Sequence, residues 1–291
     1  MSAPVRSKAI GAALWVLAFL IMVAAGRYQR LTGPTYPLAG SVTIGEATIG
    51  YEFLRSETTG KDARVALFKV VPNMAANLSY RRYGTNDPWS TVPMPTVGDS
   101  LVSFLPRQPA AGKLEYFLDV SAGNALGGIA KDEPVIIRFK GAVPLAVLLA
   151  HVLAMFIAMM VAVRAAMGAL RGEAGSKRLA IVALVLMTIG GLILGPIVQK
   201  YAFGEYWTGF PFGYDLTDNK TLIMWIAWAL AVGSYYTTYA VVQRLRRYIV
   251  ALAAIVMLVV YLIPHSLGGS QLDYDKVDQG VDPSEAIETG N

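Results

Sequence analysis

Cysteine is absent from this 291-residue chain, and histidine occurs only twice, at positions 151 and 265. The absence of cysteine excludes disulfide bonds, thiolate metal sites and covalent haem attachment through a Cys-x-x-Cys-His motif. The sequence also shows no nucleophile–base pair, phosphate-binding loop or metalloprotease motif. We therefore predict that the protein is not an enzyme.

Charged residues are also scarce. They make up 15% of the chain against 55% hydrophobic residues, and the mean hydropathy of +0.47 is too high for a soluble domain. Five segments are long and uncharged enough to be membrane helices, because a hydrocarbon core of about 30 Å needs roughly 20 apolar residues. These segments cover approximately residues 9–26, 142–163, 179–198, 221–242 and 248–263. We expect the first to be a retained anchor, although Val23-Ala24-Ala25 would also suit the cleavage site of a signal peptide.

Basic residues beside these segments predict the orientation of the chain. They are Arg6 and Lys8 before the first segment, Arg164, Arg171, Lys177 and Arg178 after the second, and Arg244, Arg246 and Arg247 before the fifth. The positive-inside rule places them on the cytoplasmic side of a bacterial inner membrane. The N-terminus is then cytoplasmic, and residues 27–141, the loop 199–220 and the acidic tail 264–291 are extracytoplasmic. The net charge of +5 thus reflects membrane anchoring and does not indicate nucleic-acid binding.

The external segment, residues 27–141, has the pattern of a β-domain. Alternating polar and apolar residues occur at 41–44, 63–71, 113–120 and 135–139, with turn residues between them. We expect an α-helical membrane protein with five transmembrane helices and one inserted all-β sandwich, immunoglobulin-like or fibronectin-like. Its parts are an anchor at 1–26, the sandwich at 27–141, a four-helix domain at 142–263 and a tail at 264–291. The composition of the tail predicts disorder unless a partner holds it.

The loop between the third and fourth apolar segments is unusually aromatic. Half of residues 201–214 are aromatic, namely Tyr201, Phe203, Tyr206, Trp207, Phe210, Phe212 and Tyr214. Such a loop suits the binding of a flat apolar group at a membrane surface. The alternative is an aromatic belt, since Trp and Tyr collect at both interfaces of a bilayer. In the β-domain, Tyr80 to Tyr83 together with Trp89 are the best candidates for a contact surface, unless they form ordinary cross-strand pairs.

The second apolar segment contains an ionisable residue near its middle. His151, Met155 and Met159 follow one another at intervals of four residues and so share one helical face. A His-Met-Met stripe suits copper or haem iron, but it is equally suited to packing in a core. His265 follows the fifth segment on the external side, where a neutral imidazole would be available as an iron ligand.

Residues 145–265 resemble the haem-handling membrane proteins of cytochrome c assembly. Those proteins have an external Trp-Gly-x-x-Trp-x-Trp-Asp loop between two helices, with a histidine on either side. The corresponding positions are Phe203, Gly204, Tyr206, Trp207 and Asp215, and His151 and His265 correspond to the flanking histidines. The resemblance implies a haem cofactor with His151 and His265 as metal ligands. Phe203, Tyr206, Trp207, Asp215 and Met155 would complete its binding site.

Two further interpretations remain open. In the first, the protein is a structural or accessory subunit that docks a larger membrane complex through the β-domain and the aromatic loop. In the second, Asp215, Asp218 and Asn219 bind a hard cation, although Asp215 or Asp218 would also suit a helix cap. We expect a non-enzymatic protein that handles haem, or an accessory subunit of a haem-containing envelope complex. Its expected partners are membrane lipid and other envelope proteins, including a cytochrome.

Overall fold

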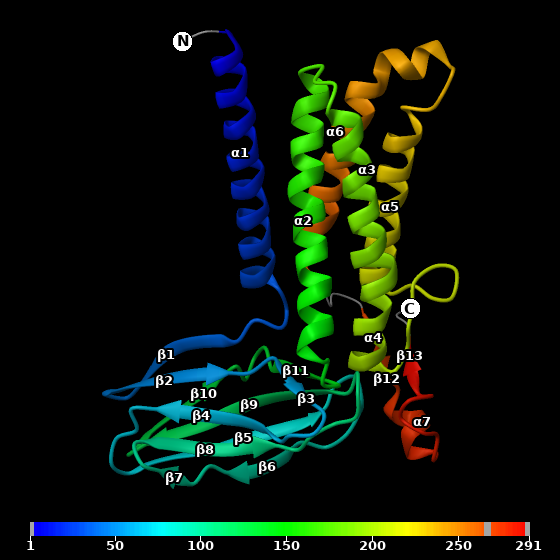
Figure 1. The fold of residues 1–291 in the computed structure, drawn as a ribbon. Coiled ribbons are helices and arrows are strands. Elements are labelled where there is room, and N and C mark those ends of the chain that lie inside the picture. The colour runs from blue at the N-terminus through cyan, green and yellow to red at the C-terminus, as the bar shows by residue number, and fades with distance from the viewer. Residues whose placement is uncertain (1–2, 265–268, 289–291) are drawn as a thin grey trace. The chain divides into compact units, whose positions relative to one another are not determined.

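The computed structural model describes residues 3–264 and 269–288, which form a helical unit and a β unit (Figure 1). The helical unit contains α1 (Ala3–Thr32), α2 (Leu145–Leu170), α3 (Ser176–Met187), the π-helix η1 (Thr188–Leu194), α4 (Gly195–Phe203), α5 (Leu216–Gly233) and α6 (Ala240–Leu262). The last two residues of α4, with Gly204, belong to the β unit. α3, η1 and α4 follow one another without a break, so they form one long helix with a π-helical centre.

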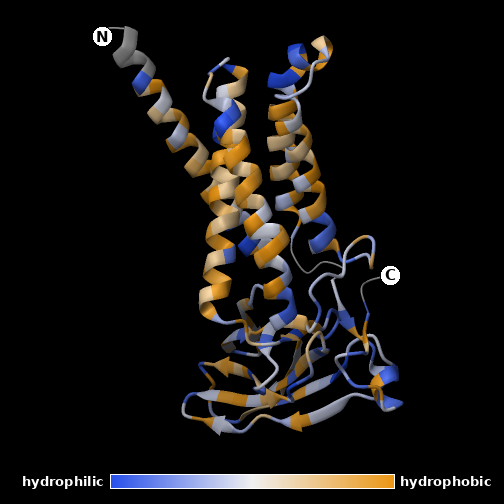
Figure 2. Cartoon of the chain, turned by 45° about the vertical axis from the view of Figure 1, so that its right-hand side comes forward, coloured by the Kyte–Doolittle hydropathy of each residue, from blue (hydrophilic) through white to orange (hydrophobic). Residues whose placement is uncertain are grey.

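Small residues allow the helices to pack closely. The fully buried alanines of α2 and α3 are Ala158, Ala162, Ala165, Ala180 and Ala183. Small side chains at a helix interface let two backbones approach, which favours association in a membrane. Large apolar side chains such as Leu153 and Ile193 remain exposed. Apolar residues, drawn in orange, predominate along the helices in Figure 2, which suits contact with lipid.

Four of the five predicted membrane spans are present. Within the described residues, four helices are long and apolar enough to cross a membrane: Lys8–Thr32, Leu145–Leu170, Ser176–Phe203 and Ala240–Leu262. α5 is not among them because its first turn contains Asp218, Asn219 and Lys220. The predicted fourth segment, residues 221–242, also extends too far, because α5 ends at Gly233. Arg244, which was assigned to a connection, lies within α6.

The β unit contains two large sheets and a small one. Its strands are β1 (Leu38–Ile44), β2 (Ala47–Phe53), β3 (Ser56–Thr58), β4 (Ala63–Phe68), β5 (Met74–Arg82), β6 (Ser90–Pro93), β7 (Thr96–Val97), β8 (Ser100–Leu105), β9 (Lys113–Ala122), β10 (Ala125–Ile129), β11 (Val135–Lys140), β12 (Gln271–Leu272) and β13 (Ile287–Glu288). The five-stranded sheet has the order β1-β2-β4-β8-β7. The six-stranded sheet has the order β3-β11-β9-β5-β6, and β10 also pairs with β9. β12 and β13 pair with each other.

One apolar core lies between the inner faces of the two large sheets. Side chains alternate between buried and partly exposed along β9, as expected for a strand with one face in a core. Ile49 and Leu67 of one sheet and Leu118 and Ile137 of the other belong to the same buried cluster. Tyr116 is also buried, and its hydroxyl donates a 2.8 Å hydrogen bond to the carbonyl oxygen of Leu54. The strands predicted at 41–44, 63–71, 113–120 and 135–139 correspond to β1, β4, β9 and β11.

The expected fold class is wrong. The protein is a mixed fold of helices and three sheets, and not an α-helical membrane protein with an inserted immunoglobulin-like or fibronectin-like sandwich. Among the residues that the structure describes, four helices qualify as spans instead of the five expected. The third sheet and the helix α7 (Tyr274–Asp278) come from residues that were expected to form a disordered tail.

The C-terminal segment, residues 270–288, is ordered because it has a small core of its own and contacts with β5 and β9. Leu272, Tyr274 and Ala286 are buried together. The Tyr274 hydroxyl accepts a 3.0 Å hydrogen bond from the backbone N–H of Lys113. Arg82 donates two 2.8 Å hydrogen bonds to the carboxylate of Asp278. Asp278, one of the acidic residues of this segment, therefore pairs with a specific arginine of β5.

Candidate functional site

The aromatic loop, residues 204–215, joins α4 to α5 and is fastened to the first turn of α5. Asp215 is the N-cap residue of α5, and its side chain accepts hydrogen bonds from the backbone N–H groups of Thr217 (2.8 Å) and Asp218 (3.4 Å). Helix-capping by Asp215, one of the alternatives for this cluster, is thus confirmed. The first turn of α5 gives the loop a fixed base.

Asp218 holds the middle of the loop. One of its carboxylate oxygens, Oδ2, accepts hydrogen bonds from the backbone N–H groups of Thr208 (2.6 Å) and Gly209 (3.1 Å). Burial raises the pKa of Asp218, while the hydrogen bond from Thr208 acts in the opposite direction. A Cβ atom on Gly209 would lie only 2.5 Å from Asp218 Cβ, so the close approach requires glycine. Gln199 also donates a 2.6 Å hydrogen bond to the Thr208 hydroxyl.

Asn219 and Trp207 fix the next residue of the loop. Asn219 Oδ1 accepts a 2.7 Å hydrogen bond from the backbone N–H of Phe210. The indole N–H of Trp207 donates to the carbonyl oxygen of the same residue at 3.0 Å. The backbone of Phe210 is therefore held on both sides, and its position does not depend on where its side chain points.

The aromatic side chains of this fixed loop point outward. The exposed fractions are 58% for Tyr206, 64% for Phe210, 79% for Phe212 and 74% for Tyr214. In Figure 1 the loop extends sideways from the junction of α4 and α5, away from the axes of these helices. Large apolar side chains held in the open by buried polar groups are typical of an interaction surface. The loop is thus rigid on its polar side and apolar on its outer side.

The predicted site residues fall into separate groups. Tyr206, Trp207 and Asp215 belong to the aromatic loop, where Lys200 Nζ lies 5.3 Å from the centre of the Tyr206 ring. Phe203 belongs to the β unit, where the guanidinium of Arg138 lies 4.0 Å from the centre of its ring. His265 lies outside the described residues.

His151 and Met155 form the remaining group and contact the π-helix η1. The Nδ1 atom of His151 is 2.8 Å from the carbonyl oxygen of Gly190. Because a carbonyl oxygen only accepts, Nδ1 carries the proton and Nε2 has the free lone pair. A Cβ atom on Gly190 would lie 3.0 Å from Met155 Sδ, so the thioether packs against the glycine. His151 and Met155 therefore share a place between α2 and η1, as their spacing predicts.

The cation-site interpretation receives no support from this geometry. The Asp218 Oδ2 and Asn219 Oδ1 oxygens face backbone N–H donors of the loop. Among the residues that the structure describes, no group of three or more histidine, cysteine or acidic residues is placed to hold a metal ion. The polar cluster beside the aromatic loop instead supplies its internal fastening.

Arg81 and Arg82, which belong to the contact surface proposed around Tyr80 to Tyr83, form ion pairs with other residues of the β unit. Arg81 donates a 2.6 Å hydrogen bond to Glu115, its register partner on β9, and its guanidinium lies 4.5 Å from the centre of the Trp89 ring. Arg82 pairs with Asp87 and with Asp278. Sequence reasoning gave cross-strand pairs as the alternative for Arg81. It missed Asp278 because this partner lies 196 residues away.

Comparisons of the chain with family models, curated proteins and solved structures gave no match. No function is therefore transferred from a relative.

Proposed function

We propose that the protein is a non-enzymatic, membrane-anchored accessory protein that docks an envelope protein through the aromatic loop. The observation that carries this proposal is the contrast between the two sides of the loop. Asp218 and Asn219 satisfy its backbone N–H groups from within, while four aromatic side chains remain exposed. A loop that is already ordered loses little conformational entropy when it binds.

The composition of the loop favours a protein partner. Tyrosine, tryptophan and phenylalanine are enriched at the centres of protein interfaces, where they supply most of the binding energy. The loop also follows directly after the candidate span Ser176–Phe203, which supports a position near one surface of the membrane. The basic residues beside the candidate spans favour the extracytoplasmic surface of a bacterial inner membrane.

Photo-crosslinking in native membranes tests this proposal. A photoreactive amino acid at position 212 should give a discrete protein adduct, because Phe212 is the most exposed of the four aromatic residues. The same label at Leu153 of α2 is the control, because this residue is also exposed but lies within a candidate span. Asp218→Ala should abolish the adduct at position 212 by releasing the loop. Lipid adducts alone at position 212 would identify the loop as an aromatic belt and refute docking.

Haem binding is the second candidate function, and one observation favours it. A metal-binding histidine usually donates its second ring N–H to a carbonyl or carboxylate, which orients the ring and leaves the other nitrogen for the metal. His151 has this arrangement with Gly190. Purified protein supplied with haem should then develop a Soret band that shifts in His151→Ala. A spectrum identical to that of free haem in detergent would exclude this function.

A further inference from the structure

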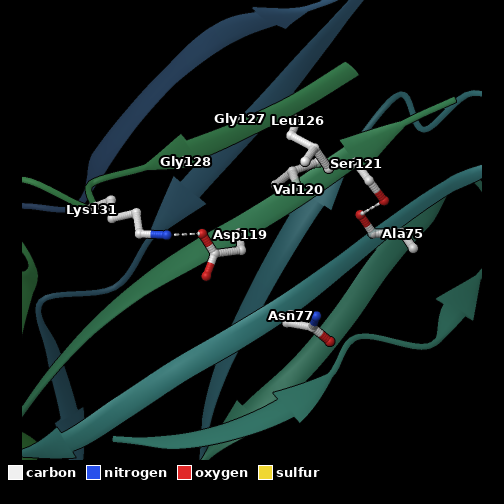
Figure 3. Close-up of a pocket in the computed structure, with 9 residues that line it drawn as sticks. All are labelled: Ala75, Asn77, Asp119, Val120, Ser121, Leu126, Gly127, Gly128 and Lys131. Carbon is white, nitrogen blue, oxygen red and sulfur yellow. Dashed lines mark hydrogen bonds and ion pairs between the residues drawn. The ribbon is translucent and has the colours of Figure 1, made fainter. Parts of the chain in front are cut away.

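The outer face of the six-stranded sheet has a groove with the chemistry of a small polar binding site. The groove has a volume of about 480 Å³ and lies over β9, between β5 and β10 (Figure 3). Its polar side chains are Asn77, Asp119, Ser121 and Lys131. All of these residues belong to the β unit, so the groove does not depend on the aromatic loop.

An ion pair defines one end of the groove. Lys131 Nζ lies 2.6 Å from Asp119 Oδ1, and both side chains remain about half exposed. In Figure 3 the other carboxylate oxygen of Asp119 points away from Lys131, so it is open to a ligand. Because the two charges compensate each other, the site has no net preference for an anion or a cation.

Two consecutive glycines make this arrangement possible. A Cβ atom on Gly128 would lie 3.0 Å from Lys131 Cβ, so a larger residue would push the lysine away from Asp119. On the inner side, a Cβ atom on Gly127 would lie 3.0 Å from Ile44 in the core. Glycine in a strand interior often marks a place where another group approaches closely.

The walls of the groove and the area beyond it are apolar. Leu126 of β10 is 84% exposed, so its apolar side chain is available to contact a ligand in the groove. Phe117 lies on the same face of β9 as Asp119, two residues earlier, and its ring centre is 4.8 Å from that of Trp89. The same face of the sheet thus carries the Asp119 carboxylate, the Lys131 ammonium and the Asn77 amide. The Phe117–Trp89 pair lies beside them, with Phe117 two residues before Asp119 on β9.

We propose that this groove binds a short neutral oligosaccharide. Sugar hydroxyl groups both donate and accept, so neighbouring hydroxyls can pair with the Asp119 carboxylate, the Lys131 ammonium and the Asn77 amide. The apolar C–H face of a sugar ring fits the exposed side chain of Leu126. An extended peptide fits less well, because β9 already pairs with β5 on one side and with β10 and β11 on the other. The floor of the groove therefore offers no free strand edge for a peptide.

Calorimetric titration of the full-length protein tests the proposal. The protein is kept in a detergent without a sugar headgroup, and the probes are the trisaccharides of glucose, mannose and N-acetylglucosamine. At least one should bind, and Asp119→Ala and Asn77→Ala should each weaken its affinity by about tenfold, the effect of losing one hydrogen bond of about 1.4 kcal/mol.

The matched control is Asn86→Ala, which removes an exposed amide from the turn between β5 and β6, outside the groove. It should leave the affinity unchanged. No binding of any of the three trisaccharides at a concentration of about 10 mM, well above typical weak affinities, would overturn the proposal. Binding that is equally strong in Asp119→Ala and Asn77→Ala would also overturn it. Neither result would affect the docking function of the aromatic loop.

Discussion

The side chain of Asp218 lies directly against the backbone of Gly209, whose N–H donates a 3.1 Å hydrogen bond to Asp218 Oδ2. The two residues are nine positions apart and belong to different parts of the structure, one to a helix and one to a loop. Their contact determines which side of the aromatic loop is turned inward. The exposure of Phe210 and Phe212 is the consequence of this contact.

Replacing Asp218 by alanine should release the aromatic loop without unfolding the helices. Thr208 and Gly209 would lose the acceptor for their buried N–H groups, at a cost of about 1–3 kcal/mol for each group. Hydrogen–deuterium exchange should therefore become faster at residues 207–211 and stay unchanged in α2. Asp218→Asn should have a smaller effect, because its amide oxygen still accepts hydrogen bonds. Equal protection in Asp218→Ala and the unmodified protein would contradict this role.

Replacing Gly209 by valine should have a similar effect for a steric reason. The new Cβ atom would meet Asp218 Cβ at 2.5 Å, so the loop must move away from α5. The expected results are faster exchange at residues 207–211 and loss of the photo-crosslink at position 212. An unchanged crosslink in Gly209→Val would show that the tight contact is not needed.

The helical unit should be sensitive to a side chain at Gly191 of η1. A Cβ atom there would lie 2.7 Å from Thr221 Cγ2 of α5, so the two helices would have to separate. Gly191→Ala should lower thermal stability in detergent by about 1–3 kcal/mol, the usual cost of overpacking. Gly233→Ala is the control, because a Cβ atom there meets nothing within 4 Å. A Gly191→Ala protein as stable as the control would refute close packing between η1 and α5.

Tyr274 should account for most of the docking of the C-terminal segment. Its ring is buried, and its hydroxyl bonds with Lys113 and Gln108. Tyr274→Ala should cost about 3 kcal/mol, as expected for a buried aromatic residue. Protease cleavage within residues 272–286 should become fast, while cleavage within β9 should remain slow. Tyr274→Phe, which keeps the ring, should show an intermediate rate. Similar cleavage of all three proteins would contradict the prediction.

The docking of this segment should weaken in acid. Hydrogen bonds from Arg82 hold the pKa of Asp278 below its ordinary value of 3.8, and they act on Asp87 in the same way. Because the folded-state pKa is lowered, the stabilisation is complete above pH values of about 4 and is lost as the pH falls through the lower folded value. Protease resistance of residues 272–286 should then be constant from about pH 5 to 7 and fall below about pH 4. Asp278→Asn should reduce this pH dependence, and an unchanged profile would exclude a contribution from the ion pair.

The sequence by itself determined the elements whose signal is local. Four apolar segments became candidate spans because length and hydropathy are sufficient for a helix in lipid. The alternation in residues 113–120 predicted β9 because one face of a strand is buried. The His151–Met155 spacing predicted their common helical face. A helix cap at Asp215 or Asp218 was one of two alternatives that the residue types allowed, and the structure selects Asp215.

Only the tertiary structure decided which distant residues meet. The segment 221–242 was expected to be a span, but the first turns of α5 contain Asp218, Asn219 and Lys220. Asp218 and Asn219 fasten the aromatic loop. The C-terminal segment has a disordered composition, yet it is ordered through Tyr274 and through Asp278, which lies 196 residues from its partner Arg82. Local patterns report how each residue suits water, lipid or a core. They carry no information on which remote donor will satisfy a carboxylate, and at Asp218 and Asp278 that pairing determines what the surface presents.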